Sequence, residues 1–447
     1  MKGKKISLDS IYNFITLIIL MELVLGGLGN LFGYPIRKVL FVVGVLSSIY
    51  VIYKEKIKID IKFIIPIVVV GIYTIYGSIV GLINGNSFSD IFSDANSFLG
   101  IIYILLLIAY IKGKNKNVNK MFNIIINCAV IVALITIGLF FFSRLYLPNE
   151  TIIITKYNWL NKKLQYGLIS GLVLSNNYAR VYLFNGIFMQ LASAVVFIRL
   201  LDKNNSKKVS EIVKISILLI AIYVSNTRGF WIGTIGVVLL VLIYYIWRRR
   251  KFNLTIKNIL IPIIPLIIVS MLISKSIVQP SNNNVEIPQA TESIKDRFEA
   301  IGDFENDISN KIRAIQFKFL IEKFKEKPVS GWGFGAHINE YSEYMVENGH
   351  HAVKTNNFEL YYVELLFKTG VIGIAIFFGY LLYNFIVLIK LLFGKVLERE
   401  AETNLVGWTI GTMSILASSI TNPYIASLSV FFVLVVEVYL IQMYSNK

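Results

Sequence analysis

Cysteine is almost absent from this chain: among 447 residues there is one, Cys128, and it lies within an apolar run. A disulfide framework and a cysteine-based metal site are therefore excluded. His350 and His351 are adjacent rather than four residues apart, and no cysteine or acidic cluster of metal-site form accompanies them. We expect neither a metal ion nor another cofactor.

Charged residues are also scarce, at 16% of the chain against 55% hydrophobic residues, and the mean hydropathy is +0.66. This composition is too apolar for a soluble domain of this size. Runs such as 63–82 and 121–142 approach or exceed the ~20 residues that cross a hydrocarbon layer of about 30 Å. Because lipid offers the backbone no hydrogen bonds, each run must be a helix. The sequence therefore predicts an all-α polytopic membrane protein.

Twelve transmembrane helices are predicted. The first is retained in this interpretation, because no small-residue cleavage site appears before Arg37. The expected spans are residues 11–30, 36–53, 62–84, 97–112, 120–143, 180–200, 211–227, 228–247, 257–276, 370–393, 404–420 and 423–443.

The net charge of +17 does not indicate nucleic-acid binding, because the lysines and arginines form short clusters between apolar runs and no basic domain exists. These clusters occupy alternate loops, at 54–62, 112–120, 203–214, 248–251 and 395–399, whereas the loop 84–96 has no Lys or Arg. The pattern predicts cytoplasmic N- and C-termini in a plasma membrane.

Three regions follow from this topology. Residues 1–276 hold the first nine helices with an outer loop at 144–179, residues 277–369 form a large extracytoplasmic loop, and residues 370–447 hold the last three helices. Two amphipathic helices are expected in the large loop. One covers 310–327, where Ile312, Ile315 and Phe319 recur at helical spacing, and Pro328 ends it. Arg313 borders its apolar face.

Arg228 lies in a break between two apolar stretches, within Ser225-Asn226-Thr227-Arg228-Gly229. A charge at that depth is costly without a partner or a cavity. Its planar donors suit a diphosphate, although an arginine that extends to the outer interface is the alternative. Arg180, just before the sixth span, either binds a diphosphate as Arg228 would or is an ordinary residue at a helix boundary.

Two carboxylates, Glu359 and Glu364, lie at the mouth of the tenth span. On a helix, residues five apart diverge by about 140°, so these two do not form a shared acid/base pair. One is expected to be functional and the other structural. The glycine-rich turn 331–335 precedes them, and a tight turn at the membrane surface with Trp332 as an interfacial anchor is its simplest interpretation.

These motifs in this order resemble the O-antigen ligase and Wzy-type polysaccharide polymerase family. In that family an outer-loop helix carries an arginine and ends in a "Pro, apolar, Gly, apolar, Gly" turn, here Pro328 to Gly335. A "His-Asn, apolar, Leu … Gly-apolar-apolar-Gly" segment follows, here Glu359 to Gly373, and the family's "Ser-Arg-Gly" is matched by Thr227-Arg228-Gly229.

One departure bears on function: Glu359 stands where ligases of the family carry histidine. Polymerases often have an acidic residue there, so the substitution favours a Wzy-type polymerase, although His351 is an alternative base eight residues upstream.

The resemblance implies a metal-independent GT-C glycosyltransferase at the outer face of the bacterial plasma membrane, which joins oligosaccharide repeat units carried on undecaprenyl diphosphate. Glu359 would be the general base, and Arg228 and Arg313 would stabilise the leaving diphosphate. Residues expected to bind the diphosphate or sugar are Arg180, Trp332, Gly333, Gly335, His351 and Asn357. The expected partners are this lipid-linked oligosaccharide, the lipid bilayer and, by family analogy, a chain-length regulator.

Two other functions remain open. A ligase would transfer finished polymer to an acceptor, and a transporter would move the lipid-linked oligosaccharide. A transporter typically shows repeated halves and a charge-lined path at the midplane. Neither is evident, and the polar residues concentrate in one outer loop, which favours the enzyme. A purely structural partner would leave Arg228 unexplained.

Overall fold

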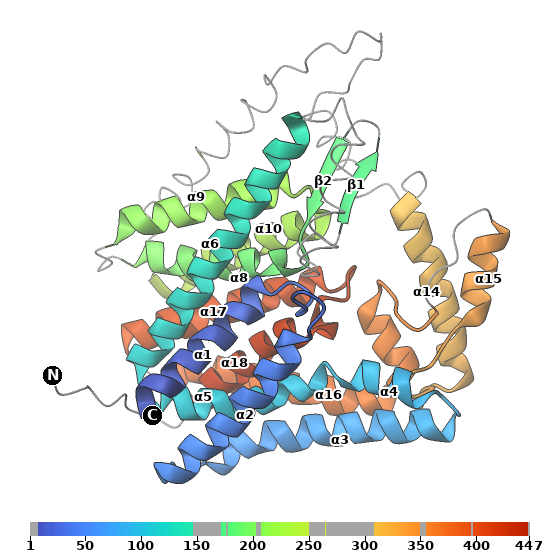
Figure 1. The fold of residues 1–447 in the computed structure, drawn as a ribbon, viewed down its shortest axis with the longest axis horizontal. Coiled ribbons are helices and arrows are strands. Elements are labelled where there is room, and N and C mark those ends of the chain that lie inside the picture. The colour runs from blue at the N-terminus through green and yellow to red at the C-terminus, as the bar shows by residue number, and fades with distance from the viewer. Residues whose placement is uncertain are drawn as a thin grey trace, which may run out of the picture. The chain divides into compact units, whose positions relative to one another are not determined.

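Helices dominate the computed structural model (Figure 1), which describes residues 8–145, 171–175, 178–202, 207–249, 308–348, 355–394 and 397–445, together with residue 264. Among these residues, eight helices are long and apolar enough to cross a membrane, and a ninth span is present if one bent helix pair is counted. The predicted class, an all-α polytopic membrane protein, is confirmed.

The predicted number of twelve spans is not confirmed. The eight candidates lie at Leu8–Leu25, Ile36–Lys54, Ile61–Ile83, Asn115–Ser143, Phe184–Leu201, Arg228–Trp247, Tyr361–Gly394 and Leu428–Ser445. The predicted span 97–112 is the bent pair Phe88–Ala95 and Phe98–Ile111, with an angle of 42°. Predicted spans 211–227 and 404–420 are helical but do not meet the same criteria, and 257–276 lies outside the described residues.

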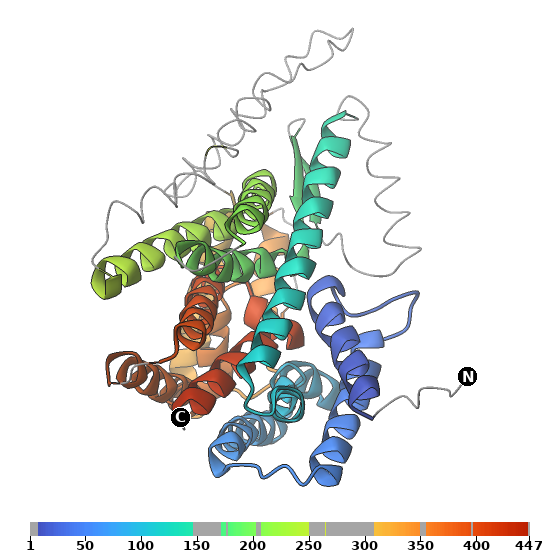
Figure 2. The ribbon, with the colours of Figure 1, turned by 90° about the vertical axis from the view of Figure 1, so that its left-hand side faces the viewer.

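The chain divides into two compact units. The first comprises residues 1–51, 109–302 and 399–415, and its helices are α1 (Leu8–Leu25), most of α2 (Ile36–Lys54), α6 (Asn115–Leu145), α8 (Ile187–Leu201), α9 (Lys208–Val224), α10 (Arg228–Arg249) and most of α17 (Arg399–Ser418). The straight helix α6, teal in Figure 2, packs against α1, α8 and α9. Helix α8 is apolar on all sides and almost wholly buried, as expected of a helix at the centre of a bundle.

A β-hairpin in this unit was not predicted. Strands β1 (Gly171–Ser175) and β2 (Tyr178–Tyr182) pair antiparallel, with Gly171 opposite Tyr182. The short helix η2 (Phe184–Gly186) follows, and α8 begins only at Ile187. The predicted span 180–200 therefore starts too early, because the apolar residues at its beginning belong to a strand, and hydropathy alone does not separate strand from helix.

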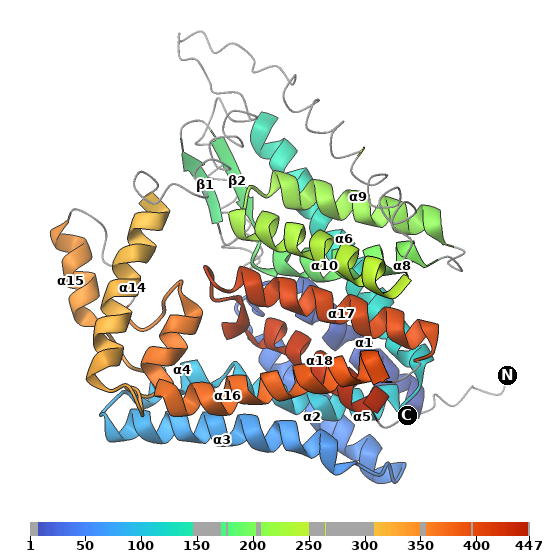
Figure 3. The same cartoon turned by 180° about the vertical axis from the view of Figure 1, so that it is seen from behind.

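The second unit comprises residues 52–108, 303–398 and 416–447. Its elements are α3 (Ile61–Ile83), α4 (Phe88–Ala95), η1 (Phe98–Ile102), most of α5 (Tyr103–Ile111), α14 (Ile308–Glu326), α15 (Asn339–Glu347), α16 (Tyr361–Gly394), η3 (Tyr424–Ala426) and α18 (Leu428–Ser445). Helix α16 packs against α3, α14 and α18, and Figure 3 shows it running along α3.

Helix α16 bends at Gly370, whose φ of 61° and ψ of −170° interrupt the helical backbone. A residue with a side chain rarely adopts this φ, and an added Cβ would lie 2.3 Å from the carbonyl oxygen of Val329. The helix therefore has a short first part, from Tyr361 to Thr369, and a long second part that spans the membrane.

The loop helix predicted at 310–327 is confirmed as α14, which ends at Glu326, two residues before Pro328. Its predicted apolar face is real, since Ile312, Ile315 and Phe319 pack on a buried cluster that includes Leu320. The other members of this cluster are Ala336, Ile338, Tyr341, Met345, Phe358 and Phe367. Helix α15, the second loop helix, supplies Tyr341 and Met345. The predicted boundaries of the three regions stay a prediction.

Candidate functional site

The glycine-rich turn is a buried backbone junction. Phe334 is 1% exposed, and its ring stacks on Phe98 and meets Tyr73 edge to face. Its amide donates to the carbonyl of Gly77 in α3 at 2.9 Å, and the amide of Gly333 donates to the carbonyl of Lys368 in α16 at 2.6 Å. The turn thus fastens α3 to α16.

Trp332 is only partly buried. Its indole Nε1 donates to the carbonyl of Lys323 at 2.8 Å, and the Lys327 ammonium lies 3.9 Å from its ring centroid. Its own carbonyl accepts from the side-chain amides of Asn84 and Asn86. The contacts of Trp332 and Gly333 therefore hold helices together, and the substrate-binding role predicted for these two residues stays a prediction.

Arg313 and Glu359 form an ion pair. Arg313 Nε lies 2.9 Å from Glu359 Oε2, with the two side chains 21% and 50% exposed. The N–H of this nitrogen lacks hydrogen-bond geometry. Among the described residues, the two terminal nitrogens of Arg313 have no recorded partner. A cation and a carboxylate that were predicted from separate motifs are thus in contact at the surface of the second unit.

The position of Glu359 is set by its chain neighbours. The amide of Leu360 donates to Gln316 of α14 at 3.0 Å, and Phe358 is buried in the cluster that α14 and α15 share. Gln316 lies one helical turn from Arg313. The same helix therefore holds the backbone beside Glu359 and supplies the guanidinium that pairs with it.

A second group of charges lies deeper, around Lys368 of α16. Its side chain is 2% exposed, and its ammonium lies 2.8 Å from Asp94 Oδ2 and 2.6 Å from Glu364 Oε1. It also donates to the carbonyl of Asn356 at 2.8 Å. Because burial of an unpaired charge would be costly, this network makes the three ions tolerable in an apolar unit. We name Asp94, Glu364 and Lys368 the charged cluster.

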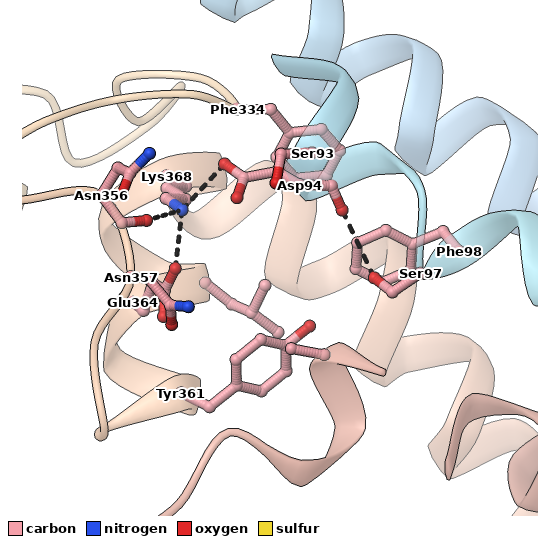
Figure 4. Close-up of a pocket in the computed structure, with 12 residues that line it drawn as sticks. Ser93, Asp94, Ser97, Phe98, Phe334, Asn356, Asn357, Tyr361, Glu364 and Lys368 are labelled. Carbon is pink, nitrogen blue, oxygen red and sulfur yellow. Dashed lines mark hydrogen bonds and ion pairs between the residues drawn. The ribbon is translucent and has the colours of Figure 1, made fainter. Parts of the chain in front are cut away.

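The charged cluster borders a pocket of about 410 Å³. Figure 4 shows Lys368 beside its partners Asp94, Glu364 and Asn356, with Tyr361 below them. The walls come from α4, η1, the glycine-rich turn and the start of α16. Of the predicted binding residues, Asn357 lines this pocket and is exposed, whereas Glu359 is not among its lining residues.

One family model matches a segment that includes parts of both units. Residues 215–378 match the family model for O-antigen ligase. This segment contains Arg228, Arg313, the glycine-rich turn, Glu359 and Lys368. It spans a little over a third of the chain, and the resemblance inferred from the motifs is confirmed there. A comparison with curated proteins finds no match. The O-antigen ligase segment supports a polysaccharide-related membrane enzyme, and both polymerase and ligase are consistent with it.

The remaining predicted residues lie elsewhere. Arg228 begins α10 in the first unit, and α9 ends at Val224, so the predicted break between the two helices is present. Gln190 of α8 supports this break by donating to the carbonyls of Gly229 and Phe230. Arg180 lies in β2, also in the first unit, and His351 lies outside the described residues. Of the three predicted catalytic residues, Arg313 and Glu359 share a unit.

Sequence reasoning missed His337, two residues after the end of the glycine-rich turn. Its Nδ1 lies 2.7 Å from Thr355 Oγ1 and its Nε2 lies 3.1 Å from Asp90 Oδ2. A carboxylate only accepts, so Nε2 carries a proton, and in the neutral ring Nδ1 accepts from the Thr355 hydroxyl. Asn356 joins this group by donating to Asp90 Oδ1 at 3.1 Å. No sequence spacing links residues so far apart.

Gly335 connects the turn to the charged cluster. Its amide donates to Asp94 Oδ2 at 2.6 Å, the oxygen that also faces Lys368. An added Cβ on Gly335 would lie 2.7 Å from the amide nitrogen of Ile91 in α4. Within the described residues, no group of three or more His, Cys, Asp or Glu side chains is arranged to hold a metal ion.

Proposed function

We propose that this chain is a membrane glycosyltransferase that polymerises oligosaccharide repeat units carried on undecaprenyl diphosphate at the outer face of a bacterial plasma membrane. The single observation that carries the proposal is the contact between Arg313 and Glu359 inside the O-antigen ligase segment, at 2.9 Å. It brings a proton acceptor and a cation together at one site, and the proposed reaction requires both.

In the reaction, an acceptor sugar hydroxyl attacks the anomeric carbon of the lipid-linked donor. The new C–O bond forms as the bond from that carbon to the diphosphate breaks, and undecaprenyl diphosphate leaves with the electron pair. Glu359 takes the hydroxyl proton. Its side chain is half-exposed and therefore accessible to a substrate.

Arg313 would stabilise the negative charge that develops on the leaving diphosphate. Its Nε faces Glu359, which leaves its two terminal nitrogens for phosphate oxygens. Because guanidinium charge supplies this stabilisation, no divalent ion is needed in the proposed reaction. Arg228 is a second candidate for the same role, and Arg180 and His351 are further candidates for substrate contacts.

Polymerase is favoured over ligase because glutamate occupies the position where ligases of the family carry histidine. A polymerase uses the lipid-linked repeat unit as both donor and acceptor, whereas a ligase transfers finished polymer to a different acceptor. A chain-length regulator is a further partner that the family resemblance implies for a polymerase.

The test is in vitro polymerisation. The purified protein is incubated in EDTA with the undecaprenyl-diphosphate-linked repeat unit extracted from the producing cells, and products are separated on a gel. We expect a ladder of products together with free undecaprenyl diphosphate. Glu359→Gln and Arg313→Gln should each lower the rate by about 100-fold or more, the range for loss of a general base or of a charge stabiliser.

A matched control lies on the same helix. Lys323 of α14 pairs with Glu340 of α15 at 2.9 Å, with exposures of 24% and 55% that resemble those of Arg313 and Glu359. The hydrogen bond from Lys323 also lowers the pKa of Glu340, so this is an ionised pair. Lys323→Gln and Glu340→Gln should keep nearly wild-type rates. Equal losses in both sets of variants, or wild-type polymer from Glu359→Gln, would refute the proposal, and transfer of preformed polymer without a ladder would identify a ligase.

A further inference from the structure

All three protons of the Lys368 ammonium are used within the protein. They are directed to Asp94, Glu364 and the carbonyl of Asn356, at 2.8, 2.6 and 2.8 Å. An ammonium with no remaining donor cannot bind an anion. The positive charge in the pocket is therefore structural, in contrast to the terminal nitrogens of Arg313.

The charged cluster leaves a carboxylate acceptor open to the pocket. Asp94 Oδ2 accepts a hydrogen bond from the amide of Gly335 and pairs with the ammonium of Lys368. Its Oδ1 has no recorded partner among the described residues, and the side chain is 21% exposed. The charged cluster contains two carboxylates and one ammonium, so its net charge is negative. A ligand that fits these groups must donate hydrogen bonds and must not be an anion.

Tyr361 adds a separate sign of a ligand. The residue is 4% exposed and lines the pocket, yet its hydroxyl has no recorded hydrogen-bond partner within the described residues. Figure 4 shows its ring reaching into the space between the labelled residues. The hydroxyl is not among the buried polar atoms that lack a partner, so it opens onto the pocket. There it would pair with a hydroxyl of an incoming ligand.

The pocket also has aromatic surfaces. Phe98, Phe334 and Tyr361 line it together with the amide of Asn357 and the hydroxyl of Ser93. Its volume of about 410 Å³ falls in the range of small-molecule sites, about 300–1,000 Å³. An apolar wall beside carboxylate and amide oxygens suits a sugar ring, which is apolar on its C–H faces and rich in hydroxyl donors at its edge.

We propose that this pocket binds the acceptor sugar, and that it selects a neutral or amino sugar and excludes acidic sugars such as uronic acids. The identity of the ligand as an acceptor rests on the proposed function. Asn357 and Tyr361 line the pocket, whereas Glu359 and Leu360, in the same segment, contact α14. Because Glu359 is not among the lining residues, the acceptor would lie in the pocket with its reacting hydroxyl extended beyond it toward Glu359.

The experiment measures binding by saturation-transfer NMR on the purified full chain, which detects weak sugar complexes. The probes are the disaccharide of N-acetylglucosamine (neutral), the disaccharide of glucosamine (cationic) and the glucuronate-containing disaccharide of hyaluronan (anionic). We expect signals from the first two and none from the third. Ser93 is an exposed wall residue, so Ser93→Trp should fold normally and abolish both signals.

Asp94→Asn tests the role of charge. It keeps an oxygen for Lys368 and Gly335 but removes the negative charge, so binding of the cationic disaccharide should weaken about tenfold relative to the neutral one. Glu340→Gln is the control, and its signals should equal those of the wild type. Binding of the anionic disaccharide as strong as that of the cationic one, signals that persist in Ser93→Trp, or no signal from any probe would each overturn the proposal.

The polymerisation assay separates this inference from the proposed function. If wild-type protein forms a ladder and Ser93→Trp forms it equally well, the pocket is not the acceptor site although the enzyme is a polymerase. If no ladder forms but the neutral and cationic disaccharides bind as described, the pocket stands as a sugar site and the polymerase function fails.

Discussion

Buried charges in the second unit are arranged as a closed network, whereas the half-exposed ones are open to a substrate. Lys368 is 2% exposed and fully paired, and its loss would strand two carboxylates in an apolar surrounding. Arg313 and Glu359 are 21% and 50% exposed. In the proposed function, catalysis therefore belongs to the exposed pair, and Lys368 keeps the walls of the pocket in place.

His337 is expected to position the segment that carries Glu359. It links Asp90 to Thr355, the residue from which the chain continues through Asn357 to Glu359. His337→Leu removes both links and should lower the polymerisation rate by about tenfold or more, since small misplacements of reacting groups are costly. His337→Gln keeps a donor and an acceptor and should recover most of this loss. Initial rates on the purified variants measure the effect.

The outcome with glutamine decides the role of His337. A positioning residue tolerates it, whereas a proton acceptor does not, because an amide is not a base at neutral pH. If His337→Gln is as inactive as His337→Leu while Glu359→Gln is active, the histidine is the general base and our assignment of Glu359 is wrong.

The sequence predicted the residues of the site unevenly, for a physical reason. Arg313 and Glu359 stand in motifs that are local in the chain, and their contact agrees with their placement beside one outer loop. Asp94 and His337 contact the site only through tertiary packing of α4 and the glycine-rich turn. No periodicity or spacing encodes such contacts, so hydropathy and motif analysis could not find them.

At the scale of elements, the apolar runs located most helices because a span must be continuous and apolar. The apolar runs did not locate the places where the backbone changes direction or conformation. These are the break between α4 and η1, the hairpin β1–β2 and the bend of α16 at Gly370. These depend on dihedral angles and on neighbouring segments, and the average hydropathy of a window does not report either.

The glycine-rich turn is the element on which the site depends most. Gly333 has a φ of 80°, and an added Cβ would lie 2.0 Å from the amide nitrogen of Gly81 in α3. Backbone cannot move aside as a flexible side chain can. Gly333→Ala should therefore destabilise the protein by about 3 kcal/mol or more, from backbone strain and a steric clash together. Thermal unfolding of the detergent-solubilised variant measures this.

Gly85 supplies the control for strain alone. Its φ is 76°, similar to that of Gly333, but an added Cβ would meet nothing within 4 Å. Gly85→Ala should cost about 1 kcal/mol. If the two variants unfold at the same temperature, then close packing against α3 contributes nothing, and the turn is not the junction described here.

At the scale of the whole molecule, the proposed reaction requires one orientation in the membrane. Undecaprenyl-linked repeat units are joined outside, so the pocket, Arg313 and Glu359 must face out. Lysines concentrate in alternate loops such as 54–62, and the loop 84–96, which contains α4 and Asp94, has none. The positive-inside rule predicts that the first loop is cytoplasmic and that the second is outside.

Cysteine labelling tests this orientation, and the chain is suited to it because Cys128, the one native cysteine, is 3% exposed. Lys58 and Asn339 are both exposed. A membrane-impermeant maleimide applied to intact cells should label Asn339→Cys and should leave the wild type and Lys58→Cys unlabelled. After permeabilisation, Lys58→Cys should react as well. Labelling of Lys58→Cys alone in intact cells would place the pocket in the cytoplasm, where a lipid-linked acceptor of the outer face cannot reach Glu359, and the polymerase proposal would fail with the topology.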